Sequence, residues 1–246
     1  MGLHDFTVYD VIDRNAASFG HLSAWYEVED GRTLSFVELK RETDRLAVGL
    51  RGLGLNKGDR IGILGKNSLE YFLLYGAAAG LGLVVLPVNW RLSAEEARFI
   101  LEDGAPGAVF VDREFQPLIE GVRGGLPSVK RFFNLKGREG EYEDFGGLPG
   151  DGDGFEPEAV ATDDGFVIIH TAAVAGRPRG ALLSHGNVIW ADMHFDYHCG
   201  LGPGDVHLNL LPLFHVGGLF MATSSFHAGA MNVNMSKFDA TRAVEL

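Results

Sequence analysis

The segment Phe166-Val-Ile-Ile-His-Thr-Ala-Ala-Val-Ala-Gly-Arg-Pro-Arg-Gly-Ala-Leu-Leu-Ser-His-Gly-Asn187 decides the fold. Residues 166–170 are mostly apolar and β-branched, which predicts a buried central strand. A loop of small residues with Arg177 and Arg179 follows, then a short apolar run, and then a helix start. Backbone amides, little steric bulk and guanidinium charge together suit a phosphate group. An ordinary glycine-containing turn is the alternative for this loop.

Short apolar strands alternate with longer helical segments along the chain. Strands are predicted over 60–65, 83–88, 108–112, 131–135, 166–170 and 206–210, and helices over 36–53, 68–81, 94–103, 114–123, 186–198 and 217–227. Three helix starts place a capping residue three positions before a glutamate, in the pairs Ser35/Glu38, Asn67/Glu70 and Ser93/Glu96. Helix ends are predicted at Gly54 and Gly200. The alternation predicts an α/β fold with mainly parallel sheets flanked by helices.

Composition allows a substantial core and disfavours a nucleic-acid-binding surface. The chain has 246 residues, 46% of them hydrophobic, and a net charge of −12. Residues 136–158 hold eight acidic residues against two basic ones, together with seven glycines. This composition predicts an exposed loop over 136–160, dividing a first α/β lobe (1–135) from a second region (161–246). An acidic partner-binding segment is the alternative for the same residues.

Cysteine content and hydropathy indicate a cytoplasmic protein. Cys199 is the only cysteine, so no intrachain disulfide can form, and the first residues show no signal-peptide pattern. Residues 69–88 are apolar enough to suggest a membrane span. Tyr71, Tyr75 and the polar exit after Pro87 instead favour a core helix followed by a buried strand.

The opening segment resembles the phosphate-binding loop of the AMP-forming adenylating enzymes, the family of acyl-CoA synthetases, luciferases and peptide-synthetase adenylation domains. That loop reads Thr-Ser-Gly-Thr-Thr-Gly-x-Pro-Lys-Gly, and Ser-His-x-Asn follows after a few apolar residues. The residues that match are Thr171, Gly176, Pro178, Gly180, Ser184, His185 and Asn187. Those that depart from the pattern are Ala172, Ala173, Val174, Ala175 and Arg179. Arginine keeps the positive charge of lysine in a different shape.

Three further segments resemble the family in its order and at about its spacing. Leu34–Leu39 is similar to an early Leu-Thr-Tyr-x-Glu-Leu motif, and 58–71, continuing to Ser93, is similar to the strand-to-helix region near the family's start. Pro212-Leu-Phe-His-Val-Gly-Gly218 resembles the segment that lines the acyl pocket.

The resemblance implies the N-terminal domain of an acyl-CoA synthetase-like fold. Its activity would be carboxylate–CoA ligation, with a fatty or aromatic acid, ATP, Mg²⁺ and CoA, through an acyl adenylate. By the same resemblance, the departing pyrophosphate would be held by Thr171, Gly176, Arg179 and Gly180. The acyl substrate would be held by His215, Gly217 and Gly218. A core histidine after a buried strand is the alternative for His215.

Later motifs of the family are missing from the sequence. There is no Tyr-Gly-x-Thr-Glu, no Thr-Gly-Asp and no late catalytic lysine. We therefore expect a truncated N-terminal domain without the C-terminal domain, inactive by itself and binding ATP weakly if at all. Sheet edges left uncovered would favour a homo-oligomer. A non-catalytic scaffold or acyl-binding protein derived from the family is the alternative.

Other site patterns are weak. His194 and His198 stand four apart on a predicted helix and could share a metal, but this spacing is common by chance. The sequence has neither a Gly-x-x-x-x-Gly-Lys-Ser/Thr loop nor a Gly-x-Gly-x-x-Gly motif after a strand. Ordinary P-loop and dinucleotide-binding enzymes are therefore disfavoured.

Overall fold

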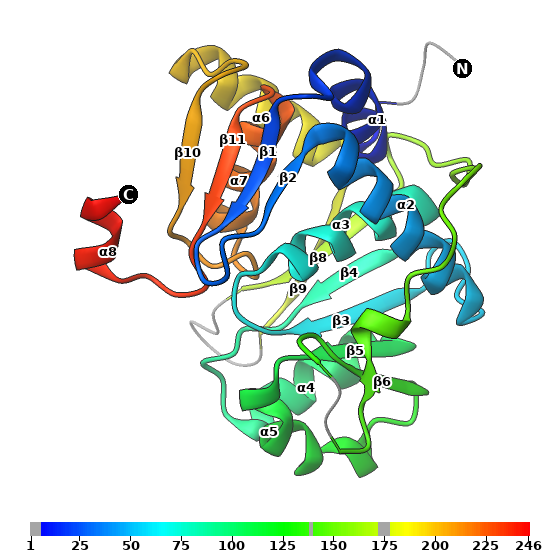
Figure 1. Cartoon of the computed structure of the whole chain (residues 1–246). Helices are drawn as coiled ribbons and strands as arrows, with labels where there is room; N and C mark the ends of the chain where they lie inside the picture. Colours follow the sequence, from blue (N-terminus) through cyan, green and yellow to red (C-terminus); the bar gives the residue numbers. More distant parts are fainter. Residues whose placement is uncertain (1–5, 138–139, 172–177) are drawn as a thin grey trace.

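Two sheets organise the chain in the computed structural model, which describes residues 6–137, 140–171 and 178–246 (Figure 1). The 7-stranded sheet has the order β7-β6-β5-β3-β4-β8-β9, and every neighbouring pair is parallel except β8 and β9. Its strands are β3 Arg60–Leu64, β4 Val84–Pro87, β5 Ala108–Val111, β6 Arg131–Asn134, β7 Glu143–Asp144, β8 Gly165–His170 and β9 Gly180–Ser184. The predicted α/β class with mainly parallel sheets is confirmed.

The smaller sheet joins the two ends of the chain. It has four strands in the order β10-β11-β1-β2, namely β10 Val206–Asn209, β11 Met231–Asn234, β1 Ser23–Glu27 and β2 Thr33–Ser35. Strands β1 and β11 pair in parallel although more than two hundred residues separate them in the sequence. Residues 136–160 therefore do not separate the two sheets, because each sheet takes strands from both sides of that segment.

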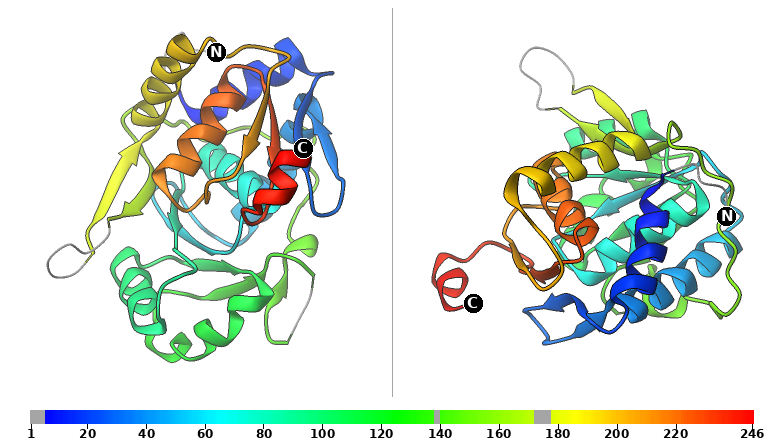
Figure 2. Two further views of the ribbon diagram at one scale, coloured as in Figure 1. Left: turned by 90° about the vertical axis from the view of Figure 1, so that its left-hand side faces the viewer. Right: turned by 90° about the horizontal axis from the view of Figure 1, so that it is seen from above.

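Helices cover both faces of the larger sheet (Figures 1 and 2). The helices of the described residues are α1 Val8–Phe19, α2 Phe36–Gly52, α3 Leu69–Leu81, α4 Ala94–Gly104, α5 Gln116–Glu120, α6 His185–Cys199, α7 Val216–His227 and α8 Ala240–Glu245. Helix α8 lies apart from the larger sheet, beyond the smaller one (Figure 1). Alternate strand residues face opposite sides: Ile61 and Ile63 join the core with α1, α2 and α3, whereas Leu64 joins the core with α4. This alternation is expected of strands buried on both faces.

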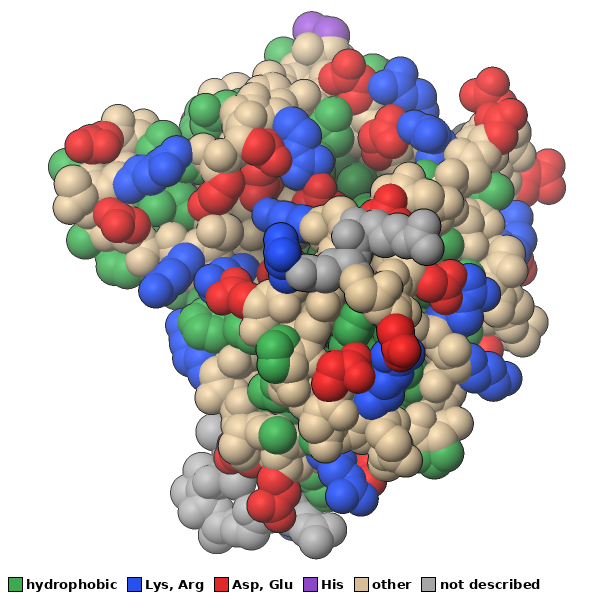
Figure 3. Space-filling model, turned by 60° about the horizontal axis from the view of Figure 1, so that its bottom comes forward, with side chains coloured by type: hydrophobic (Ala, Val, Ile, Leu, Met, Phe, Trp, Pro, Cys, Tyr) green, Lys and Arg blue, Asp and Glu red, His purple; other side chains and the backbone are tan. Residues whose placement is uncertain are grey.

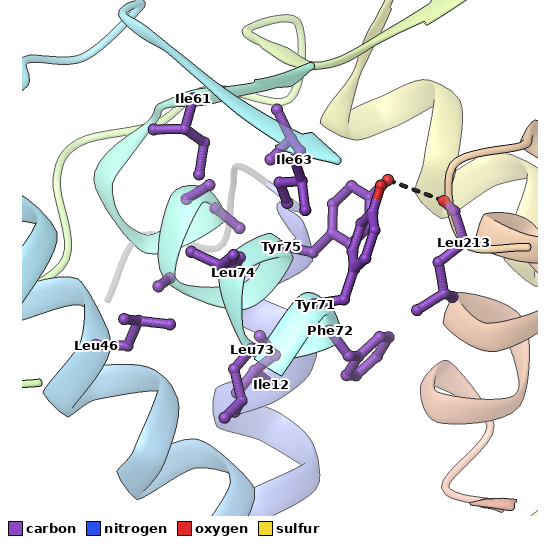
Figure 4. Packing of buried hydrophobic residues seen from close by; sticks show 14 of the residues in the cluster. Ile12, Leu46, Ile61, Ile63, Tyr71, Phe72, Leu73, Leu74, Tyr75 and Leu213 are labelled. Carbon is purple, nitrogen blue, oxygen red and sulfur yellow. Dashed lines mark hydrogen bonds between the residues drawn. The ribbon is translucent and has the colours of Figure 1, made fainter. Parts of the chain in front are cut away.

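Helix α3 is the centre of the larger core. All of its residues are buried, and its aromatic and leucine side chains fill the space between the sheet, α1 and α2 (Figure 4). Gly76 allows this packing, since a Cβ there would lie 3.0 Å from atoms of Ile12 and Thr43. The expected core helix followed by a buried strand is thus confirmed over 69–88. Within the described residues, no helix is both long enough and apolar enough to span a membrane.

Several boundaries differ from the sequence-based expectation. Ser68, not Asn67, caps α3, because its hydroxyl accepts the amide of Tyr71. The helix expected over 114–123 is broken into the 3-10 turns Arg113–Phe115 and Arg123–Gly125 around the short helix α5. Glycine-rich sequence around residue 121 explains the break.

Most described residues of the acidic segment are exposed or half-buried, but a few contact the rest of the domain. Tyr142 and Phe145 are buried, β7 pairs with β6, and Phe145–Gly147 forms a third 3-10 turn. Phe155 packs edge-on against Tyr9, with ring centroids 5.8 Å apart. Widely spaced aromatic residues therefore anchor the segment to the domain despite its glycines and charge.

Charges on the face that holds α4 and α5 are mixed. Lysine and arginine side chains alternate there with aspartate and glutamate (Figure 3). Close ion pairs account for part of this pattern, as in Arg98–Glu102 at 2.8 Å and Arg123–Glu120 at 3.1 Å. This face therefore presents no continuous basic surface.

Candidate functional site

The β8–β9 hairpin carries three of the four proposed phosphate-site residues. Thr171 directly follows β8, and Arg179 directly precedes Gly180, the first residue of β9. The amide of Thr171 donates to the carbonyl oxygen of Arg179 at 3.0 Å, so the two residues face each other across the base of the loop. All three are exposed. Gly176, the fourth residue, lies outside the described residues.

Gly180 has a packing role in this hairpin. A Cβ there would lie 2.8 Å from Cγ2 of Ile168 and 3.1 Å from Nε2 of His170. The glycine therefore lets β9 pass close to the side chains of β8. This requirement is independent of any ligand.

The Ser184-His-Gly-Asn187 motif begins α6. The Ser184 hydroxyl accepts the amide of Asn187 at 3.2 Å, and the Asn187 side chain accepts the amide of Ser184 at 3.0 Å, which forms a capping box. Gly186 leaves room for Thr162, whose Cγ2 would lie 2.6 Å from an added Cβ. This part of the family-like motif fixes local structure next to the loop.

His185 is buried between α1 and β8. Its Nδ1 accepts the amide of Val8 at 3.2 Å, and its ring lies 5.0 Å from that of Phe166. Burial lowers the pKa of His185 to about 4, with a smaller opposing effect from Asp164. The ring is therefore neutral at neutral pH and ties the first helix to the start of α6.

His215 caps the N-terminus of α7. Its Nδ1 accepts the amide of Gly217 at 3.1 Å, and the imidazole is exposed. Gly217 is only loosely surrounded, since an added Cβ would meet nothing closer than His215 Nδ1 at 3.4 Å. At Gly218, by contrast, a Cβ would overlap the carbonyl oxygen of Pro212. Gly218 is thus required by packing, whereas His215 and Gly217 border open space.

Residues 211–215 are held at the carboxyl edge of the 7-stranded sheet. The Asn67 side chain donates to the carbonyl oxygen of Leu211 and accepts the amide of Leu213, both at 2.8 Å. The Tyr75 hydroxyl donates to the Leu213 carbonyl oxygen at 3.0 Å (Figure 4). Sequence reasoning missed both residues, because their partners lie more than 130 residues away in the chain.

The two predicted groups share this edge. Parallel strands β3, β4 and β8 end on the same side, so Asn67, Trp90 and Thr171 follow strand ends at one edge. Ligands of open α/β sheets bind at the carboxyl ends of the strands. Tyr75 also contacts β8 directly, with its ring 5.8 Å from that of Phe166. The described contacts do not join Arg179 to His215.

Two places in this arrangement are candidates for anion binding. Arg179 is exposed beside Thr171, and a guanidinium in such a position suits a phosphate. The positive end of the α7 dipole and the exposed His215 ring favour a carboxylate near Gly217. A carboxylate and a polyphosphate are the two groups that an acid-activating reaction must bring together.

A further hollow at this edge was also missed. It encloses about 840 Å³ beyond the ends of β3, β5 and β6, and its walls include Lys66, Asp112, Arg113 and Tyr142. Asp112 is buried and accepts the amide of Lys66 at 2.7 Å. Burial raises the pKa of Asp112, and the hydrogen bond from the Lys66 amide opposes that rise. The strand-end rule could have pointed to these residues, but not to a cavity between them.

His194 and His198 lie on α6, as expected. Their rings are 4.6 Å apart, and Nδ1 of His198 contacts the carbonyl oxygen of His194 at 2.8 Å. Across residues 6–137, 140–171 and 178–246, no three His, Cys, Asp or Glu side chains gather as a metal site would require.

The fold and the order of the motifs point to one protein family, and the comparisons agree. The chain belongs to the AMP-binding enzyme family, whose model matches residues 12–246. It is 32% identical over 235 residues to a fatty acid–[acyl-carrier-protein] ligase of Streptomyces coeruleorubidus, covering 88% of this chain and 41% of that protein. It is 36% identical over 213 residues to an indoleacetate–CoA ligase of Aromatoleum aromaticum, covering 85% of this chain and 41% of that protein.

Solved structures of CoA ligases have the same fold as this chain. A long-chain-fatty-acid CoA ligase structure from Rhodopseudomonas palustris superimposes with a TM-score of 0.94 at 40% identity, covering 99% of this chain and 61% of that one. The N-terminal domain of FACL13 from Mycobacterium tuberculosis superimposes with a TM-score of 0.85 at 26% identity, covering 97% of this chain and 59% of that one. The chain thus spans less than half the length of the curated relatives, and its fold is that of acyl-CoA ligase N-terminal domains.

Proposed function

We propose that the chain is the part of an ATP-dependent carboxylate–CoA ligase that holds the departing pyrophosphate and the acyl group. The observation that carries the proposal is the common edge of the 7-stranded sheet, where Thr171 at the end of β8 and the residues leading to α7 both lie. The reaction would join a carboxylate to the α-phosphorus of ATP, release pyrophosphate, and then transfer the acyl group to a thiol.

Catalysis in this proposal is mainly positioning and charge stabilisation. The guanidinium of Arg179 would neutralise charge that develops on pyrophosphate as the bond to the α-phosphorus breaks. Thr171 and Gly180 would contribute the base of the loop, and Gly176 is the fourth residue proposed to hold pyrophosphate. His215 and the start of α7 would orient the carboxylate for in-line attack, and Gly217 and Gly218 would leave room for the acyl chain.

Mg²⁺ is part of the proposal as a counter-charge for the phosphates. The described residues form no group of three potential metal ligands, so we assign no protein ligand and no step to the metal. CoA is the proposed thiol acceptor, although a carrier protein is the acceptor named for one relative. A cytoplasmic location fits the single cysteine, Cys199.

The acid class is proposed as fatty or aromatic. The named relatives include ligases of both kinds of acid. The acid class rests on these relatives alone, because the apolar void beside α7, lined by residues such as Ile12, Phe72 and Phe226, measures only about 20 Å³ and has no room for an acyl chain.

A non-catalytic role is the second candidate, and the loop sequence favours it. Residues 172–175 are Ala-Ala-Val-Ala, where the family pattern has three hydroxyls and a glycine. Each lost hydrogen bond costs roughly 0.5–1.5 kcal/mol, so three losses would weaken phosphate binding by about tenfold to a thousandfold. We therefore propose that this chain alone is inactive and binds ATP only weakly.

Nuclear magnetic resonance of the ¹⁵N-labelled chain tests the proposed site. Pyrophosphate should shift the amide signals of Thr171 and Gly180, and decanoate or phenylacetate should shift those of Gly217 and Gly218. Arg179→Ala should abolish the first set, and Arg41→Ala, which removes an exposed cation from α2, should leave it unchanged. Shifts confined to other regions would contradict the proposal. An ATP dissociation constant near ~1 μM would contradict weak binding.

A further inference from the structure

The Asn67 side chain forms a two-point clamp on the backbone that leads to His215. Its amide nitrogen and oxygen bind the Leu211 carbonyl and the Leu213 amide at 2.8 Å each, an arrangement like one rung of a β-ladder. Asn67 is 5% exposed and Leu213 is fully buried. Buried hydrogen bonds of this kind are costly to lose, because the abandoned groups stay desolvated.

Tyr75 completes the clamp from α3. Its hydroxyl donates to the Leu213 carbonyl oxygen, so both backbone groups of Leu213 are bound by side chains. Burial raises the pKa of Tyr75 well above its usual range, which keeps the hydroxyl protonated as a donor. Its ring also packs on Tyr71 and on Phe166 of β8. The clamp thus ties residues 211–213 to the strand that carries the phosphate loop.

A continuous series of contacts runs from this clamp to the imidazole. Pro212, between the two clamped residues, accepts the amide of His215 at 3.0 Å. The same Pro212 carbonyl faces Gly218, where no side chain fits. His215 then accepts the Gly217 amide through Nδ1. A shift of Pro212 would therefore change both the start of α7 and the hydrogen bond that orients the His215 ring.

We propose that Asn67 is a positioning residue for His215, acting through Leu211–Leu213 and Pro212, with Tyr75 as its partner. This inference rests on the proposed function only where it assigns His215 to the acyl site. The geometry does not depend on that assignment: the clamp holds the imidazole so that Nδ1 is an acceptor and Nε2 carries the proton and faces open space. A carboxylate arriving at α7 would then meet a fixed N–H donor.

The ring nitrogens of His215 provide the test. Long-range ¹H–¹⁵N spectra of the 246-residue protein at pH 8 report which nitrogen carries the proton, and the signal missing from His215→Asn assigns the residue. Asn67→Ala should lower the ratio of the Nε2–H to the Nδ1–H tautomer on the order of fivefold. The reason is that the Gly217 amide would no longer donate to Nδ1 and so would no longer favour the Nε2–H tautomer. Asn67→Asp keeps an acceptor for Leu213 but offers no donor to Leu211, so it should give a smaller change of the same sign.

Asn134→Ala is the matched control. Asn134 is 1% exposed at the end of β6, on the same edge, and its side chain donates to the Lys136 carbonyl rather than to residues 211–215. It should destabilise the protein without moving the His215 signals. If Asn67→Ala does not fold, Asn67→Asp and Tyr75→Phe decide the question by the same spectra.

Unchanged His215 signals in every folded clamp variant, or equal changes in Asn134→Ala, would overturn the inference. The spectra need no acid and no nucleotide. A failure of acid binding therefore bears on the proposed function alone, and a failure of the tautomer change bears on the clamp alone.

Discussion

At the scale of single residues, Gly218 shows that motif positions can be required by packing before any ligand is considered. Gly218→Ala would place a Cβ on the Pro212 carbonyl oxygen, so we expect a loss of about 2–3 kcal/mol in the free energy of unfolding. Chemical denaturation measures it. Gly52→Ala is the control, because a Cβ there meets nothing within 4 Å, and it should be neutral or slightly stabilising. Equal effects of the two substitutions would contradict this packing account.

Glu27 links the smaller sheet to the start of helix α3 and should make stability depend on pH. It is fully buried and accepts hydrogen bonds from Trp25 Nε1 at 3.0 Å and the Leu69 amide at 3.0 Å. Asn234 also donates to it, at 3.1 Å. These donors favour the ionised carboxylate, but burial is the larger effect and raises the pKa of Glu27 from 4.5 to about 7.

The sign of the effect follows from linkage. The folded protein holds the Glu27 proton more tightly than the unfolded chain, so stability is full below pH 4.5 and falls as pH rises from 4.5 to about 7. Relative to Glu27→Gln, the wild type should lose about 3 kcal/mol across this window. Denaturation of both proteins at several pH values between 4 and 8 checks it. Parallel stability curves would refute the raised pKa.

At the scale of elements, the start of α6 separates structural from ligand-binding parts of the motif. Ser184→Ala removes a capping box and should cost about 1 kcal/mol, as should Ser93→Ala, which removes the equivalent box of α4. Thermal or denaturant unfolding gives both values. Pyrophosphate binding should survive in both variants. Its selective loss in Ser184→Ala would assign the hydroxyl to the phosphate site instead.

Local signals explain which elements the sequence could predict. Ser35 and Ser93 were identified as caps because capping is encoded within four residues. Strands β1 and β11 were missed, since both are short and pair across most of the chain. Asn67 was assigned to capping because it stands three residues before Glu70, which is a local capping pattern. Its neighbour Ser68 satisfies the helix, which leaves the asparagine for distant backbone groups that no local pattern reveals.

The candidate site could be proposed only through resemblance to a family. Residues such as His215 and Gly217 carry no periodic or spacing signal of their own, and their roles came from the order of the motifs. The common sheet edge, by contrast, follows from the parallel strands that the sequence did predict. The hollow near Lys66 and Asp112 depends on where loops meet, which tertiary packing alone determines.

At the scale of the whole molecule, exposed surface predicts self-association. β10 is an edge strand of the smaller sheet, with Val206 63% exposed. Trp190 and Tyr197 on α6 are 69% and 84% exposed. Association would cover such surface. Light scattering at tens of micromolar should therefore show a dimer or larger species, and Trp190→Glu should reduce it more than Val37→Glu on α2. A monomer at that concentration would refute this expectation.

The central claim is that this chain supplies part of a carboxylate-activating site. Acid-dependent exchange of labelled pyrophosphate into ATP, by the full product of the gene that encodes the chain, tests it most directly. We predict exchange that requires a fatty or aromatic acid and falls at least about tenfold in Arg179→Ala, because a charge-assisted phosphate contact is lost. No exchange with any acid, in a folded protein, would contradict the claim and favour the non-catalytic role.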